Sequence, residues 1–317
     1  MSSARSGHAV KRLGALVVLS VLAAACSPAA GSPSPSPSVA TAPPTLTPTA
    51  SASASLNACP ATAALSTLPV LARVSGDPDD VAVTPSGSLW ISDRDGGRLL
   101  ELSASGDVLL TIADPNGPEG IVVLADGKLI VAEQVPNRLD LVDPATRTTS
   151  PWLQLGPTSS PTQGVDGIGA RGTAVLVPDS ARGRFLTVLV GAGDAAGIPT
   201  LVATGLGRPV GAADGGAGSA LLVLENPPGL VRVTLATGSV AAVAQFASLD
   251  DVVVQHGIVY AANLADHSLV AVDPAGGASR TLVSNAPAPQ GLAILPDGRL
   301  LLVDSTTRVL VTLSSCG

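Results

Sequence analysis

A pattern of about 40 residues recurs six times between Asp79 and Asp304, and this repeat constrains the fold more than any other feature of the chain. Each copy usually starts with an acidic or amide residue and continues with an apolar triplet, a turn and a second apolar run that ends in Asp, Glu or Asn. The clearest copies begin at Glu119 and Gln290. Short strands that repeat with a period of about 40 to 47 residues are typical of a β-propeller, in which each copy forms one blade.

Strand signals within one copy predict four strands per blade. In the first copy these signals cover residues 81–83, 89–92, 99–102 and 108–112. The sixth copy stops after its third strand, at residues 309–313, whereas residues 68–74 precede the first copy and match a fourth strand. The sequence therefore predicts an all-β fold, a six-bladed β-propeller of four-stranded blades closed by an N-terminal strand that completes the last blade. A β-sandwich is the alternative, but it requires neither a fixed period nor this closure.

The composition limits both the core and the ligands of such a fold. The 34 Gly, 27 Pro and 2% aromatic residues predict many turns and a core of small aliphatic side chains. The formal net charge of −7 and the presence of only two lysines, Lys11 and Lys128, argue against nucleic acid as a partner, because phosphate binding needs clustered basic residues. Cations or neutral ligands suit this charge better.

The N-terminal region predicts export and a lipid anchor. Basic residues in 1–12 precede an apolar run at residues 13–25 that is too short to span about 30 Å of hydrocarbon. The sequence Leu-Ala-Ala-Ala-Cys that ends at Cys26 resembles the bacterial lipobox, which implies cleavage before Cys26 and a diacylglycerol on its thiol. Ordinary signal cleavage, with Cys26 incidental, is the alternative. We therefore expect a signal peptide at 1–25 and a protein anchored to the membrane at the bacterial cell envelope.

Two further segments follow the anchor. Residues 26–57 are nearly all Ser, Pro, Ala, Thr or Gly, a composition that predicts a disordered tether. Residues 58–317 hold the six-bladed propeller, which we expect to be monomeric. Cys59 and Cys316 lie at the two ends of this region, and in an oxidising compartment they predict a disulfide bond. Two free thiols are the alternative.

The residues that open the six copies are the candidate binding or catalytic site. The innermost strands of a propeller line its central channel, so these side chains should converge at one mouth of it. Carboxylates gathered there repel one another unless they bind a cation or take up a proton. Ligand sets made only of oxygen favour Ca²⁺ or Mg²⁺. The alternative is that each side chain caps its own strand or accepts a hydrogen bond from the backbone of a neighbouring blade. The openers are Asp79, Glu119, Asp166, Val210, Asp250 and Gln290.

A second recurrent set ends the second strand of each copy. Arg98, Arg138 and Arg184 follow three of its members at one offset, and Arg308 follows Asp304 one residue closer. This spacing predicts ion pairs across short hairpins, a role that braces turns and carries no chemistry. The set is Asp93, Glu133, Asp179, Glu225, Asn263 and Asp304.

Residues 65–316 resemble the six-bladed propellers of the NHL-repeat and gluconolactonase (senescence-marker-protein) superfamily. The resemblance lies in the Pro-x-Gly-hydrophobic openers at Pro118 and Pro289, the Pro-Asp-Gly turn at Pro296 and the strand-ending Asp-Ser at Asp304. For the lactonase branch it implies a divalent ion, often Ca²⁺, held by channel-facing side chains. Such motifs specify the fold better than the activity.

Two functions are compatible with these features. The first is a lipid-anchored module that binds a protein, a glycan or a small molecule. The second is a metal-dependent lactonase, for which the resemblance implies Glu119 and Asp166 as metal ligands, in one ring with Asp79, Asp250 and Gln290. In that case the ion polarises the ester carbonyl, and Asp79 or Asp250 serves as the base for a water molecule.

Overall fold

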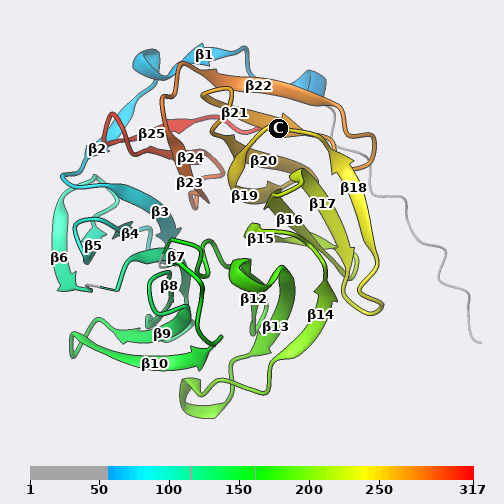
Figure 1. Ribbon diagram of the computed structural model, residues 1–317. Coiled ribbons are helices and arrows are strands. Elements are labelled where there is room, and N and C mark those ends of the chain that lie inside the picture. Colours follow the sequence, from blue (N-terminus) through cyan, green and yellow to red (C-terminus); the bar gives the residue numbers. More distant parts are fainter. Residues whose placement is uncertain (1–55, 115, 161) are drawn as a thin grey trace, which may run out of the picture. The chain divides into compact units, whose positions relative to one another are not determined.

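A computed structural model describes residues 56–114, 116–160 and 162–317. These residues form six sheets arranged as blades around a central axis (Figure 1). The predicted all-β, six-bladed propeller is therefore confirmed. The predicted signal peptide, the anchor residue Cys26 and most of the predicted tether lie outside the described residues. Within the described part of the chain, no helix is long and apolar enough to cross a membrane.

The first four blades each use four consecutive antiparallel strands. The first blade consists of β3 (Pro78–Val83), β4 (Leu89–Asp93), β5 (Arg98–Leu102) and β6 (Val108–Ala113). The second consists of β7 (Pro118–Val123), β8 (Leu129–Glu133), β9 (Arg138–Asp143) and β10 (Thr148–Gln154). The third consists of β11 (Gly169–Arg171), β12 (Ala174–Asp179), β13 (Arg184–Leu189) and β14 (Thr200–Thr204). The fourth consists of β15 (Pro209–Gly216), β16 (Ser219–Glu225), β17 (Pro228–Thr234) and β18 (Val240–Ala244).

The last two blades recruit strands from the N-terminal side of the repeat. The fifth consists of β19 (Leu249–Gln255), β20 (Ile258–Asn263), β21 (Ser268–Val272) and β22 (Ser279–Ser284), with β1 (Ala63–Ala64) added in parallel to β22. The sixth consists of β23 (Pro289–Ile294), β24 (Leu300–Asp304) and β25 (Val309–Leu313), completed by β2 (Val70–Arg73). The short 3-10 helices are η1 (Leu56–Ala58), η2 (Leu65–Thr67), η3 (Ser180–Arg182) and η4 (Ala192–Asp194).

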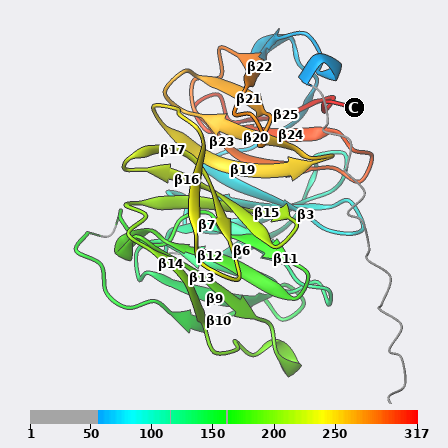
Figure 2. The same ribbon diagram turned by 90° about the vertical axis from the view of Figure 1, so that its right-hand side faces the viewer.

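The ring closes as the sequence predicts. Strand β2 pairs antiparallel with β25, and Val70 lies opposite Val311. Cys59 and Cys316 form a disulfide bond, which confirms the predicted pairing. Figures 1 and 2 both place the blue N-terminal segment beside β22 and near the C-terminal end. The additional strand β1, which extends the fifth blade, was not predicted, because two alanines give no strand signal of their own.

Turns of the predicted kind join the inner strand to the second strand in the first, second and sixth blades. Between β7 and β8 the Leu124 N–H donates to the Lys128 carbonyl at 2.8 Å. Gly127 has a φ of +90°, a conformation that side chains with a Cβ rarely adopt. The Asp126 side chain also accepts a hydrogen bond from the Lys128 N–H at 3.1 Å. The Asp-Gly pairs at 126–127 and 297–298 are therefore explained by the geometry of these hairpins.

The hydrophobic core is divided into six clusters, each of which lies between two neighbouring blades. Aliphatic side chains dominate every cluster, as the composition predicts. The few large rings fill single positions: Trp90 packs between the first and second blades, and Tyr260 between the fifth and sixth. Because every blade is packed on both faces, the inner strands are held in fixed positions around the channel.

Candidate functional site

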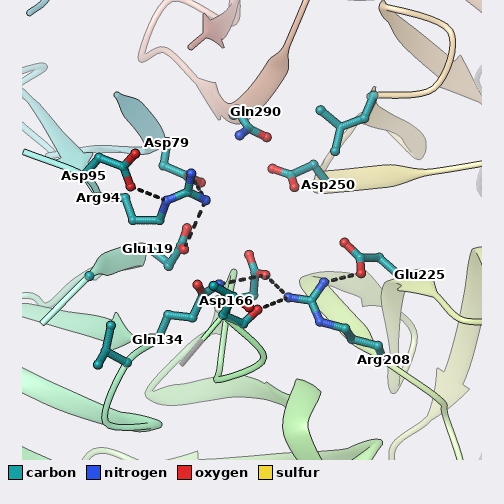
Figure 3. A pocket seen from close by; sticks show the side chains of 14 residues that line it. Asp79, Arg94, Asp95, Glu119, Gln134, Asp166, Arg208, Glu225, Asp250 and Gln290 are labelled. Atoms are coloured by element: carbon teal, nitrogen blue, oxygen red, sulfur yellow. Dashed lines mark hydrogen bonds and ion pairs between the residues drawn. The ribbon is translucent and has the colours of Figure 1, made fainter. Parts of the chain in front are cut away.

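The predicted openers converge at one end of the channel. A cavity of about 600 Å³ lies there, and the openers from all blades but the fourth line it (Figure 3). We call this cavity the acidic mouth. Its polar lining residues are Asp79, Arg94, Asp95, Glu119, Gln134, Thr162, Asp166, Arg208, Glu225, Asp250 and Gln290. The remaining opener, Val210 of the fourth blade, is buried with 1% of its surface exposed and lies below the mouth.

A narrow neck separates the acidic mouth from the opposite end of the channel. The space in the neck is only about 10 Å³, and the backbones of Gly120, Gly167 and Gly291 help to line it. A Cβ at Gly120 would lie 2.5 Å from the Ile168 nitrogen, so the close approach of the inner strands requires glycine there. Beyond the neck, a second cavity of about 370 Å³ opens between the other ends of the inner strands.

Asp80 and Asp251 take the structural role that the sequence offered as an alternative for the openers. The Asp80 carboxylate accepts hydrogen bonds from its own neighbour Val81 at 2.7 Å and from Ile121 of the next blade at 2.9 Å. Asp251 bridges the fifth and sixth blades in the same way, through Leu292 at 2.8 Å. Backbone bridging therefore belongs to the residue after the opener, and the opener side chains themselves lie in the cavity.

Arg94 neutralises the acidic mouth on the side of the first two blades. It follows the last residue of β4, and its Nη1 lies 3.4 Å from Asp79 and 3.7 Å from Glu119. Its Nη2 donates to Asp77 at 2.9 Å. Burial raises the pKa of Glu119 well above its usual range, and the neighbouring Asp79 raises it further. One guanidinium group thus serves several carboxyl groups at once.

Arg208 performs the same task on the side of the third and fourth blades. It precedes β15, and its Nη2 donates to Asp166 at 2.9 Å. Its Nη1 forms an ion pair with Glu225 at the end of β16. Burial raises the pKa of Asp166 to about 7, although Arg208 acts in the opposite direction. Glu225 belongs to the strand-ending set, and here it supports the mouth and not a hairpin.

Asp250 is the carboxyl group of the mouth without a cation. Within the described residues its side chain has neither an ion pair nor a hydrogen bond, and Figure 3 shows it across the opening from Arg94. Burial raises its pKa well above the usual range, and the charges of Asp79 and Asp166 raise it further. Two buried acceptors also receive no hydrogen bond: Gln290 Oε1, and Glu119 Oε1, which lies 3.7 Å from Arg94 Nη1. The mouth therefore offers the unpartnered carboxyl group of Asp250 to a ligand.

The predicted hairpin ion pairs form in two of four places. Arg98 pairs with Asp93 and Arg184 with Asp179, each at 2.7 Å. The predictions for the other two pairs are wrong, and local geometry explains both. Arg138 instead binds Asp140 on its own strand, at 2.6 Å. At Asp304, the N–H and hydroxyl groups of Thr307 donate to the carboxylate at 2.8 and 2.6 Å and take the place of Arg308.

Glu133 is left without a guanidinium group as a result. Its side chain is fully buried, and neither carboxyl oxygen has a hydrogen-bond partner among the described residues. Burial, together with the neighbouring carboxyl group of Asp114, raises the pKa of Glu133 to about 10. Asp114 is also buried, and its Oδ2 has no partner either. This pair of acids therefore holds a proton at neutral pH.

The arrangement of the acidic mouth does not fit a divalent metal ion. No group of three or more His, Cys, Asp or Glu side chains within the described residues has the arrangement of a metal site. Arg94 and Arg208 lie beside the carboxylates of Asp79, Glu119 and Asp166, where an ion would have to bind. Neither arginine could be predicted from the repeat, because neither recurs between blades. The signal that could have identified them is a basic residue directly next to a strand end at the mouth.

Comparison with known structures supports the fold. A gluconolactonase from Xanthomonas campestris aligns with a TM-score of 0.62 over 78% of this chain and 88% of its own, at 15% identity. The calcium-binding protein regucalcin from Agrobacterium tumefaciens aligns with a TM-score of 0.62 over 78% and 93%, at 17% identity. Virginiamycin B lyase from Staphylococcus aureus aligns with a TM-score of 0.58 over 76% and 82%, at 12% identity. Neither a protein-family profile nor a curated sequence matches the chain. The predicted resemblance to gluconolactonase-like six-bladed propellers is thus confirmed for the fold.

Proposed function

We propose that this protein is a binding module whose acidic mouth holds a small polar ligand, and that a lipid on Cys26 anchors it at the cell envelope. The observation that carries the proposal is the Asp250 carboxyl group, which has no partner among the described residues and lines a cavity of about 600 Å³ (Figure 3). That volume is typical of small-molecule sites. The described residues that line the cavity include neither His nor Cys.

A thermal-shift panel tests this function. We expect at least one small polar compound, from a panel of amines, polyols, carboxylates and lactones, to raise the melting midpoint of the purified protein, because a ligand that binds only the folded state stabilises it. A compound that acts at the mouth should lose its effect in the Asp250→Asn variant. If no compound of the panel shifts the midpoint, the proposal of a small-molecule site fails.

The same measurement with a chelator addresses the metal hypothesis. We expect EDTA, added Ca²⁺ and added Mg²⁺ to leave the midpoint unchanged, because guanidinium groups already accompany Asp79, Glu119 and Asp166. A rise in Ca²⁺ that disappears in Glu119→Gln and Asp166→Asn would instead support the predicted metal ligands. The two variants serve as the control, since both replace a carboxyl oxygen by an amide nitrogen without changing the shape of the side chain.

Lactone hydrolysis is a second candidate function. The observation that favours it is Asp250, a carboxyl group with a raised pKa that faces the cavity without a partner and has the chemistry of a general base. Asp79 suits that role less well, because Arg94 holds it at 3.4 Å. Under this hypothesis, the purified protein should open an aliphatic lactone, and Asp250→Asn should lower the rate by about a hundredfold or more. The absence of turnover would leave binding as the function of the site.

A further inference from the structure

We infer that the ligand of the acidic mouth is an organic cation that carries N–H donors, such as a primary ammonium group, held by Asp250 with Glu119 and Gln290. This inference rests on the proposed function and specifies its ligand class. It depends on three properties of the mouth: the distribution of cations, the surplus of acceptors and the chemistry of the cavity wall.

The distribution of cations leaves one position open. Arg94 contacts Asp79 and Glu119, and Arg208 contacts Asp166 and Glu225. Asp250 has no cation within the described residues, and its neighbour around the ring is the apolar Val210. Four carboxyl groups, those of Asp79, Asp166, Asp251 and Asp80, disfavour its charge. A cationic ligand supplies the charge that the protein does not provide at this position.

The surplus of acceptors requires donors on the ligand. Glu119 lines the mouth with only 1% of its surface exposed, and its Oε1 receives no hydrogen bond, although Arg94 Nη1 lies 3.7 Å away. Gln290 Oε1 is likewise buried and unpartnered. An unsatisfied buried acceptor is costly, so a ligand that donates to it gains affinity. A primary ammonium group has three donors and a positive charge, whereas a quaternary ammonium group has the charge alone.

The cavity wall argues against the other common classes of ligand. An anion would meet guanidinium groups that are already bound to carboxylates, together with the remaining negative charge. A sugar or other polyol has donors, but it leaves Asp250 without a counter-ion. The described residues that line the cavity also include no aromatic ring, the usual face on which sugar rings and quaternary ammonium groups pack.

Calorimetric titration of the purified full chain tests this inference. The probes are putrescine, which has two primary ammonium groups, tetramethylammonium, which has charge without donors, and sorbitol, which has donors without charge. We expect putrescine to bind at least about tenfold more tightly than either of the other two, a difference of about 1.4 kcal/mol, because only putrescine combines a positive charge with N–H donors. Asp250→Asn should weaken putrescine binding about tenfold or more.

The control variant is Asp107→Asn, which removes one carboxylate at an exposed turn of the first blade, outside the mouth. Its affinity for putrescine should equal that of the wild type, which separates a local effect from one of net charge. Equal binding of putrescine and tetramethylammonium, unchanged binding in Asp250→Asn, or no binding of putrescine would each overturn the inference. Tighter binding of sorbitol would also overturn the ligand class, while the proposed binding function would stand. A melting midpoint that Asp250→Asn leaves intact verifies that this variant folds.

Discussion

Replacement of Cys59 and Cys316 by serine should lower the free energy of unfolding by about 2–5 kcal/mol, the usual cost of losing a native disulfide. The bond joins residues 257 positions apart and therefore restricts nearly the whole propeller in the unfolded state. A cross-link over such a long loop removes more chain entropy from the unfolded state than one over a short loop. The expected loss is a large fraction of the 5–15 kcal/mol that is typical of folded domains.

The disulfide also supports the closure of the ring in the folded state. It fixes the segment before β2, and β2 provides the outer strand of the last blade. Cys316 is buried, and its N–H donates to the hydroxyl of the buried Tyr260 at 2.9 Å. Without the bond, β2 is held by its backbone pairing with β25 and by the side chains that pack around it. We therefore expect β2 to exchange its amide hydrogens before the other strands in the variant.

Urea denaturation followed by circular dichroism measures the change. Dithiothreitol should shift the wild-type midpoint to that of the double variant and should leave the variant unaffected, which separates loss of the bond from an effect of the serine side chains. An equal midpoint for the oxidised wild type and the variant would show that the bond contributes nothing to stability.

The sequence could predict those features of the fold that recur in every blade. The opener positions recur at a fixed spacing, and five of the six line one end of the channel. The last copy lacks a fourth strand, and β2 supplies it as predicted. Repetition also predicted that Asp79, Glu119, Asp166, Asp250 and Gln290 lie at one end of the channel. This prediction was possible because a propeller places equivalent residues of successive blades around one axis.

The chemistry of the site could not be predicted from the same repetition. Arg94 and Arg208 each occur in one blade only, so no periodic signal identifies them. They decide whether the carboxylates present an open ring to a metal or a set of ion pairs. The side-chain partners of Arg138 and Arg308 depend on competition with Asp140 and Thr307, which a constant offset in sequence does not reveal.

Glu133→Gln should raise stability at neutral and alkaline pH, by about 2–4 kcal/mol near pH 8. Burial beside Asp114 raises the pKa of Glu133 from its ordinary value of 4.5 to about 10 in the folded protein. Between these two values the folded state binds more protons than the unfolded chain. The stability contributed by this group is therefore fully present below about pH 4.5 and is lost as pH rises toward 10. Glutamine carries no proton to lose, so the variant avoids this loss.

A matched position in the first blade gives the control. Asp93 ends β4 as Glu133 ends β8, but its carboxylate accepts hydrogen bonds from Asp77 at 2.8 Å and Gly96 at 3.0 Å and pairs with Arg98. Asp93→Asn should therefore lower stability, by about 1–3 kcal/mol, since it breaks an interaction with a charged partner. The same chemical change, acid to amide, thus has opposite signs at two equivalent positions of the repeat.

Chemical denaturation of both variants and the wild type at several pH values separates the possible results. The advantage of Glu133→Gln should be largest near pH 8 and should shrink toward pH 4.5, where the unfolded wild-type chain also keeps its proton. At acidic pH the wild-type Glu133 keeps its own proton and can donate to Asp114, so glutamine should give no advantage there. A Glu133→Gln variant less stable than the wild type near pH 8 would mean that Glu133 is ionised in the folded protein and bound to a cation.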